Sequence, residues 1–234
     1  MKILCFSDWQ GKLKGDFLVE VLKKCDVPDF LIFAGDGILN LISERDYPVM
    51  DKSLEGYING HYRKYGKSEG ILSKLVNIPK KAFLYVEGND DPMINLNSKG
   101  AIRISGKSFR CFYNFVGLEG STDPIGGITR REEGYYWEVL ENALKVGERM
   151  IIVSHAPPYG ILDKIPRGTK IGSKSLRGFL EIYSHWVPLV LCGHAHNYGG
   201  RWIRFKETVV INCAMSVVEV EVKEGFVGRI RIVF

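Results

Sequence analysis

Five short apolar runs along the chain are each followed by a polar residue that can bind a metal ion. The runs cover residues 3–6, 30–34, 82–86, 150–153 and 187–192, and the residues that follow them are Asp8, Asp36, Asn89, His155 and the pair His194/His196. Any one of these, taken alone, is typical of a turn, a cap or a surface position. Five in series after successive apolar runs, involving three of the five histidines, indicate one shared site.

The types of side chain in this set indicate its chemistry. Imidazole and carboxylate groups without thiolate suit divalent first-row metals such as Mn, Fe, Co, Ni or Zn. Six or seven ligands are too many for one tetrahedral zinc, but they suffice for two ions that share a bridging carboxylate. Two such ions roughly 3.5–4 Å apart can hold a phosphate group and activate a water as hydroxide for in-line attack on phosphorus. The set therefore predicts hydrolysis of a phosphate ester at a dinuclear centre.

The elements that position these residues alternate along the chain. Continuous apolar runs of this length predict strands buried on both faces. Apolar stripes at helical spacing lie between them at 17–25, 71–76, 136–144 and 176–183, the last with Ser173 or Ser175 as its N-cap. This alternation predicts an α/β fold with a largely parallel sheet, in which loops beyond the carboxyl ends of the strands form the ligand site.

The pattern of apolar and polar residues changes after His196. Residues 202–205, 208–213, 216–222 and 226–234 read as short strands joined by turns, so we expect a β-meander that completes a second sheet. The 234 residues fit a single domain, 1–234, with an insertion at about 43–66 where apolar residues are sparse. The loops at 120–131 and 157–172 are long and rich in Gly and Pro, which is typical of functional loops.

Charge and cysteine content narrow the class of protein. The formal charge of +5 suits an anionic substrate and does not by itself indicate nucleic-acid binding. The five cysteines are odd in number and form no CxxC pair, which favours a reducing compartment. The first apolar run is too short for a signal peptide, and no run reaches membrane-spanning length. We therefore expect a soluble cytoplasmic protein with no membrane partner.

With these residues in view, the chain resembles the calcineurin-like metallophosphoesterase superfamily. The family pattern runs Asp-x-His, Gly-Asp, Gly-Asn-His-Asp/Glu, a strand-end His and Gly-His-x-His. The corresponding blocks here are Asp8-Trp9-Gln10, Gly35-Asp36, Gly88-Asn89-Asp90-Asp91, His155 and Gly193-His194-Ala195-His196. Five blocks in the same order, from the first residues to about residue 200, are a specific signal.

The resemblance implies a fold and a ligand set. The fold is an α/β sandwich of two mixed β-sheets flanked by helices. Two divalent ions are expected, with manganese first and Fe, Zn, Ni or Co as the other candidates. By matching position, Asp8, Gln10 and His196 would bind the first ion; Asn89, His155 and His194 would bind the second; and Asp36 would bridge them.

Two positions depart from the family pattern. Gln10 stands where a His ligand is usual, and its neutral oxygen could bind a metal more weakly or hydrogen-bond a water on the ion. Asp90 stands where the family has a His that protonates the leaving group. A carboxyl group can act as the acid only if its pKa is raised. Asn89 and Asp90 are thus the candidate catalytic residues, and without an acid, esters with good leaving groups would be favoured.

The leading hypothesis is a phosphoesterase, with phosphodiesters favoured as substrates. A nuclease is a narrower alternative, supported by the basic and aromatic stretch around His61. A metal-binding scaffold with little catalysis is an alternative of another class, kept open by the departures at positions 10 and 90. Lys170, Lys174 and Arg177 flank a helix start and are a candidate substrate wall. The natural substrate, the choice of diester or monoester, the metal and the oligomeric state stay open at this point.

Overall fold

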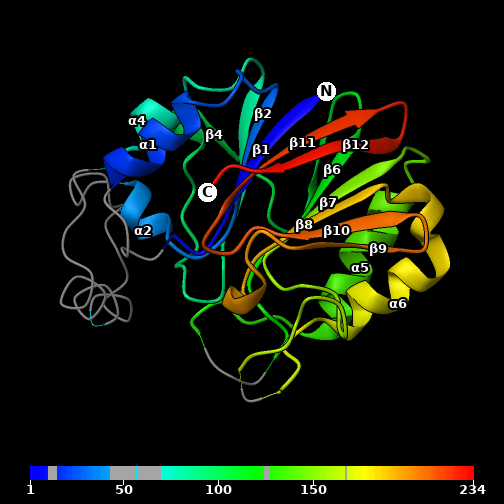
Figure 1. The fold of residues 1–234 in the computed structure, drawn as a ribbon. Helices are drawn as coiled ribbons and strands as arrows, with labels where there is room; N and C mark the ends of the chain where they lie inside the picture. The colour runs from blue at the N-terminus through cyan, green and yellow to red at the C-terminus, as the bar shows by residue number, and fades with distance from the viewer. Residues whose placement is uncertain (10–14, 43–55, 57–69, 124–126, 167) are drawn as a thin grey trace.

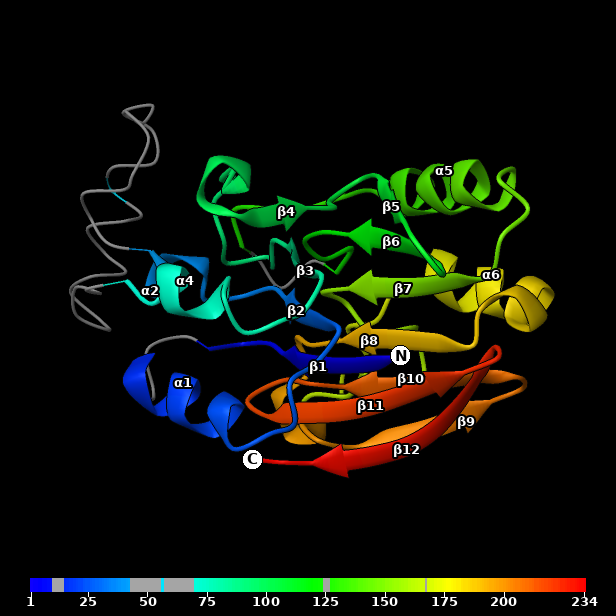
Figure 2. The same ribbon diagram turned by 90° about the horizontal axis from the view of Figure 1, so that it is seen from above.

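The computed structural model describes residues 1–9, 15–42, 56, 70–123, 127–166 and 168–234. Gln10 and His61 lie outside the described residues, as does the insertion predicted at about 43–66 apart from residue 56. The fold that positions the remaining site residues consists of two sheets packed face to face with helices on both outer faces (Figures 1 and 2).

The first sheet is built around the N-terminal strands. Its order is β12 (Phe226–Ile232), β11 (Val217–Lys223), β1 (Lys2–Phe6), β2 (Phe30–Ala34), β3 (Ala82–Val86) and β4 (Ala101–Arg103). Strands β1 to β4 run parallel, whereas β11 is antiparallel to β1 and β12 is antiparallel to β11. The sheet is therefore mixed.

The second sheet is mixed in the same way. Its order is β5 (Ser108–Arg110), β6 (Asn114–Leu118), β7 (Met150–Ser154), β8 (Leu189–Cys192), β10 (Thr208–Asn212) and β9 (Trp202–Phe205). Strands β6, β7, β8 and β10 are parallel, and the two edge strands β5 and β9 are antiparallel to their neighbours. This arrangement confirms the predicted fold class of two mixed sheets in a sandwich.

Helices cover the outer face of each sheet (Figure 2). Helices α1 (Gly15–Lys23), α2 (Ile38–Leu41) and α4 (Leu72–Leu75) lie against the first sheet, and α5 (Glu133–Leu144) and α6 (Lys174–Tyr183) lie against the second. Short 3-10 turns are found at Asn97–Lys99, Ser184–Trp186 and His196–Tyr198. The predicted cap of α6 is confirmed, since Ser173 Oγ accepts a hydrogen bond from the Leu176 amide at 3.1 Å.

The central strands are buried on both faces, which explains their continuous apolar sequences. In β2, for example, Phe30 and Ile32 face the layer between the sheets, whereas Leu31 and Phe33 face the outer helices. Helix α1 places Leu18 and its neighbours on this outer layer. Each such side chain removed from water contributes on the order of 1.5–3 kcal/mol before the opposing loss of chain entropy.

The C-terminal strands are arranged differently from the expected meander. Strands β9 and β10 join the second sheet, with β10 parallel to β8, whereas β11 and β12 cross to the first sheet. Strand β11 pairs with β1 from Lys2↔Glu221 to Phe6↔Val217, and Val218, Val220 and Val222 face the layer between the sheets. The prediction of one meander was wrong because β11 satisfies the edge of β1 that β2 leaves unpaired.

Candidate metal centre

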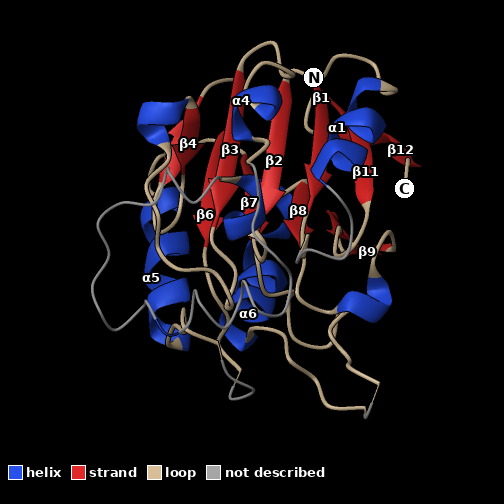
Figure 3. Ribbon diagram, turned by 90° about the vertical axis from the view of Figure 1, so that its left-hand side faces the viewer, coloured by secondary structure: helices blue, strands red, loops and turns tan. Residues whose placement is uncertain are grey.

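The predicted ligands come together at one end of the sandwich, where the parallel strands end. Asp8 follows β1, Asp36 follows β2, Asn89 follows β3, His155 follows β7 and the Gly193–His196 segment follows β8. Figure 3 shows the loops gathered beyond the carboxyl ends of these strands. Six of the seven predicted metal ligands thus lie at one edge, and the seventh, Gln10, is outside the described residues.

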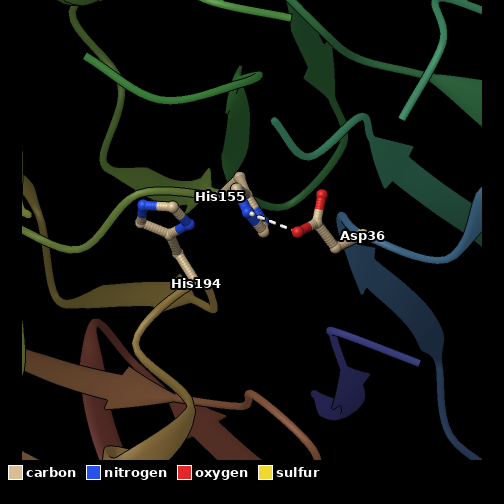
Figure 4. A group of neighbouring side chains, drawn as sticks. All are labelled: Asp36, His155 and His194. Atoms are coloured by element: carbon tan, nitrogen blue, oxygen red, sulfur yellow. Dashed lines mark ion pairs between the residues drawn. The ribbon is translucent and has the colours of Figure 1, made fainter. Parts of the chain in front are cut away.

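His155 stands at the centre of the tightest group. Its Nε2 lies 2.9 Å from Asn89 Oδ1 and 3.4 Å from Asp36 Oδ2. Ligand atoms of Asp36, His155 and His194 all lie within 4.8 Å of one another, and the three side chains converge in Figure 4. This spacing is compatible with a single cation bound among them.

The tautomer of His155 fits a cation. Its Nδ1 lies 2.9 Å from the carbonyl oxygen of Ala34, which can only accept a hydrogen bond, so the proton of the neutral ring is on Nδ1. The lone pair on Nε2 then faces two oxygen atoms, those of Asn89 and Asp36. Three electron-rich atoms around one point need a proton or a cation between them, and this chemistry fits a metal ion.

The ionisation of His155 agrees with this need for positive charge. Burial would lower the pKa of the imidazole, but the charge and hydrogen bond of Asp36, with the charge of Asp8, outweigh burial and raise the pKa to about 10. The ring is completely buried. Without a cation, a proton therefore takes the place on Nε2.

His194 is held by a carboxylate that the sequence analysis did not identify. Its Nε2 lies 2.8 Å from Asp123 Oδ2, and Asp123 is itself only 6% exposed. Because Nε2 is engaged there, Nδ1 is the nitrogen left to face Asp36 and His155. A carboxylate bound to the remote nitrogen of a metal-binding histidine fixes the ring and raises its basicity as a ligand.

A second group forms around Asp8. Its Oδ1 lies 2.9 Å from His196 Nε2, and its Oδ2 accepts hydrogen bonds from Ser7 Oγ at 2.6 Å and from the His194 amide at 2.9 Å. Burial would raise the pKa of Asp8, but the hydrogen bonds from His196 and Ser7 and the charge of His155 lower it. The His196 side chain is 40% exposed, so this part of the site opens to solvent.

Asn89 is oriented by the residue beside it. Its Nδ2 donates a hydrogen bond to Asp90 Oδ1 at 2.9 Å, which turns its Oδ1 toward His155. The Asp90 amide in turn donates to Asp36 Oδ1 at 2.8 Å. In this arrangement the carboxylate of Asp90 acts as an acceptor that aims the amide oxygen of Asn89 at the centre.

Asp91 ties two of the ligand loops together, a role that the sequence analysis did not assign to it. Its carboxylate accepts hydrogen bonds from the amides of Asp36 at 2.7 Å, Gly37 and Ile38 at 2.8 Å each, and Gly88 at 2.9 Å. Burial and the charge of Asp36 raise the pKa of Asp91 to about 7 against the opposing effect of these amides. The loops after β2 and β3 are thereby locked to each other.

Two glycines of the sequence blocks are required by close approach of these loops. A Cβ on Gly88 would overlap the Asp36 carboxylate and backbone, and a Cβ on Gly193 would overlap Ser7 Oγ and Asp8 Oδ2. The backbone is also unusual at three candidate ligands, since Asp8, Asp36 and His194 have φ of 58°, 58° and 67°. Positive φ at residues other than glycine is found preferentially at functional sites, where surrounding contacts hold it in place.

Asp123, which the sequence analysis did not identify, follows a strand that was also missed. Strand β6 at Asn114–Leu118 is fully buried, and Asp123 lies five residues beyond its end. The run Phe115-Val116-Gly117-Leu118 was a signal for this strand. The first carboxylate after that run is Glu119, which pairs with Arg131 at 2.8 Å, and Asp123 lies four residues further on, so the run gave no direct signal for Asp123. The stretch around His61 behind the nuclease hypothesis lies outside the described residues.

Comparison with known proteins gives the class of this chain. The family model for calcineurin-like phosphoesterases matches residues 1–198. The chain is 29% identical over 162 residues to the uncharacterised protein MJ1162 of Methanocaldococcus jannaschii, covering 65% of this chain and 73% of that one. The protein therefore belongs to the calcineurin-like phosphoesterase family, a family of metal-dependent hydrolases.

Solved structures share the fold at low sequence identity. The protein TT1561 of Thermus thermophilus aligns with a TM-score of 0.64 and 16% identity over 100% of this chain and 99% of that one. A dimetal phosphatase from Danio rerio aligns with a TM-score of 0.60 and 13% identity over 96% and 93% of the two chains.

None of the helices in the described part of the chain has the length and apolar character that a membrane-spanning helix needs.

Proposed function

We propose that this protein hydrolyses phosphate esters, phosphodiesters in preference, with two divalent cations held by Asp8, His196, Asp36, Asn89, His155 and His194. The observation that carries the proposal is the convergence of His155 Nε2, Asn89 Oδ1 and Asp36 Oδ2, three electron-rich atoms that need a positive charge between them. When bound, the cations would neutralise the phosphate oxygens and lower the pKa of a water. We expect manganese as the resident metal, with Gln10 as a further ligand.

The protein's own residues have distinct parts in this proposal. His155 and His194 are fixed through their remote nitrogens by the Ala34 carbonyl oxygen and by Asp123, so neither ring has to reorient during the reaction. Asp36 belongs to the group around His155 and is, by the family pattern, the candidate bridge to the second cation. Pre-organised ligands of this kind avoid reorganisation cost in the transition state.

The preference for diesters follows from charge. Asp8, Asp36, Asp91 and Asp123 are buried at this edge, which makes it rich in carboxylates. A monoanionic diester is repelled less by these groups than a dianionic monoester. Asp90 is held as a hydrogen-bond acceptor by Asn89, which disfavours it as a proton donor and favours esters with good leaving groups.

The test begins with protein stripped by chelator. Mn²⁺, Ni²⁺, Zn²⁺ or Mg²⁺ is added back separately, and hydrolysis of bis(p-nitrophenyl) phosphate is compared with that of p-nitrophenyl phosphate. We expect Mn²⁺ to restore activity, with the diester preferred. Asp36→Asn and His155→Ala should abolish it, whereas the exposed residues Asp26 and His185 give matched controls as Asp26→Asn and His185→Ala. Failure to bind any of these metals would contradict the proposal.

A metal-binding scaffold is the second candidate, and a surface away from the centre favours it. At the opposite end of the sandwich, Phe112 is 72% exposed beside a depression of about 860 Å³, and Phe226 nearby is 68% exposed. Exposed aromatic side chains of this size are typical of contact surfaces. Metal binding without hydrolysis of either ester would favour the scaffold.

We also propose a cytoplasmic location for the protein. Its five cysteines are free, which is typical of a reducing compartment.

A further inference from the structure

Three cationic side chains gather around Tyr159 beside the start of helix α6. Lys170 Nζ lies 4.7 Å and Lys174 Nζ 5.7 Å from the centre of the Tyr159 ring. Arg177 Nη1 is 3.4 Å from the Tyr159 carbonyl oxygen, to which it donates a hydrogen bond. Lys170 Nζ and Arg177 Nη1 both lie within 3.7 Å of the position that a Cβ on Gly160 would occupy, so the cations share one small area of surface.

Among the described residues only one of the three cations of this cluster forms an ion pair, although the carboxylates of Glu133 and Asp163 bind backbone amides close to it. Arg177 Nε pairs with Glu181 at 2.9 Å. In the part of the chain that the structure describes, the Lys170 and Lys174 ammonium groups contact the Tyr159 ring and form no ion pair with a carboxylate. Like charges closer than a Debye length of about 8–10 Å repel one another, so an anion placed among them would be stabilised.

The backbone amides at the amino end of helix α6 are not available to bind a further anion, because the Glu133 carboxylate already binds them. Glu133 accepts hydrogen bonds from the Lys174 amide at 2.8 Å, the Ser175 amide at 2.8 Å and Ser173 Oγ at 2.7 Å. These bonds lower the pKa of Glu133 against the effect of burial. The free amides of the helix are thus satisfied, and an anion at Tyr159 would be held by side chains.

The cluster lies at the same end of the sandwich as the metal centre. Its loop leaves β7 directly after His155, and β7 and β8 are parallel, so helix α6 must begin at that end and return to the other (Figure 1). The same loop also contacts Asn212, a residue that holds the backbone next to the metal ligand His194. Asn212 Nδ2 lies 3.4 Å from the Leu162 carbonyl oxygen and 3.1 Å from that of Gly193, beside His194.

We propose that Lys170, Lys174 and Arg177 form a phosphate-binding site outside the metal centre. Two compact ammonium charges and one guanidinium group suit the several oxygens of a phosphate. Its position indicates that it holds a phosphate group of the substrate that is not cleaved, so the preferred substrates carry more than one phosphate. This second statement rests on the proposed hydrolase function, whereas the binding site itself does not.

Binding is tested without metal, where the centre's carboxylates repel anions. The metal-free protein is titrated with inorganic tripolyphosphate by calorimetry. We expect Lys170→Ala/Lys174→Ala to weaken binding about tenfold, because two charge-assisted contacts are lost. The matched control is Lys107→Ala/Lys145→Ala, which removes the same charge from exposed lysines elsewhere. Thermal denaturation checks that each variant is folded. No binding by the unmodified protein, or equal weakening in both double variants, would overturn the proposal.

The role in substrate binding is tested with Mn²⁺ restored. The measured quantity is kcat/KM for thymidine 3′-phosphate 5′-(p-nitrophenyl phosphate), a diester that carries a second phosphate, relative to kcat/KM for thymidine 5′-(p-nitrophenyl phosphate). In Lys170→Ala/Lys174→Ala this ratio should fall about tenfold through a higher KM for the diester with the second phosphate. An unchanged ratio would overturn this role. If the unmodified protein binds tripolyphosphate but hydrolyses neither ester, the hydrolase function fails and the phosphate site stands.

Discussion

Asp123 Oδ2 lies 2.8 Å from Nε2 of His194, and the two residues are separated by 71 positions in the sequence. Asp123 follows β6 and His194 follows β8, so the contact is made only when the second sheet is assembled. The pair fixes which nitrogen of His194 is available to a cation. Its function can be measured separately from hydrolysis.

We predict that Asp123→Asn weakens metal binding by about 10- to 100-fold, the range found when the supporting carboxylate of a metal-binding histidine is removed. The measurement is a Mn²⁺ titration of the metal-free protein by calorimetry. Asp26→Asn is the matched control, because Asp26 is exposed and its carboxylate pairs with Lys2 far from the centre. Unchanged Mn²⁺ affinity in Asp123→Asn would show that His194 needs no such support.

Replacement of Asp91 by Asn should destabilise the whole site. An amide at this position can accept at one oxygen only, so some of the amides of Asp36, Gly37, Ile38 and Gly88 lose their partner. Buried donors left unpaired cost about 1–3 kcal/mol each. We expect a loss of that order in the free energy of unfolding, measured by urea denaturation, together with weaker Mn²⁺ binding. A loss of stability no larger than that of Asp26→Asn would argue against this role.

The close approach at Gly193 leads to a matched pair of glycine substitutions. Gly193→Ala would drive a methyl group into Ser7 Oγ and Asp8 Oδ2, and we expect a loss of about 3 kcal/mol or more with loss of metal binding. Gly134→Ala is the control, since Gly134 lies in helix α5 and nothing lies within 4 Å of the added Cβ. That substitution should stabilise the protein by about 0.5–1 kcal/mol, because alanine is the better helix former. Equal melting temperatures for the two variants would contradict the assigned contact.

The metal-free protein should lose stability as the pH rises from 7 to 10. The pKa of His155 is about 10 in the folded state and 6.5 in the reference state. A group whose folded pKa is raised contributes stability that is fully present below pH 6.5 and is lost as the pH passes through 10. The melting temperature without metal should therefore fall over this range. Saturating Mn²⁺ should flatten the dependence because the cation replaces the proton, and identical slopes with and without metal would exclude this linkage.

Asp90 could orient Asn89 or could protonate the leaving group. The two roles predict a different dependence of the Asp90→Asn rate loss on the leaving group of the ester. If Asp90 acts by aiming Asn89, as their 2.9 Å hydrogen bond indicates, Asp90→Asn should slow esters with good and poor leaving groups by a similar factor. If Asp90 is the acid, the phenyl ester should slow by about 100-fold or more relative to the p-nitrophenyl ester. We expect the first result for bis(p-nitrophenyl) phosphate and its phenyl analogue. The measurement is kcat for both esters in both proteins.

Much of the fold could be predicted because the strands are buried on both faces. The apolar runs that predicted β1, β2, β3, β7 and β8 are continuous for that reason. Strand β6 is equally buried, but Gly117 interrupts its run and a Cβ there would overlap the Ile104 carbonyl oxygen. The pairing of β11 with β1 could not be predicted, because residues more than 200 positions apart leave no local pattern of their register.

The sequence by itself determined which residues could bind metal, since Asp8, Asp36, Asn89, His155, His194 and His196 each follow a recognisable strand. It also determined the family, through the order of those blocks. Only the tertiary structure decided how each ligand is held. Asp91 bridges two loops, Asp123 supports His194, and the Ala34 carbonyl oxygen sets the tautomer of His155. These contacts join different strands, and a hydrogen bond between distant segments depends on their packing and has no sequence spacing that predicts it.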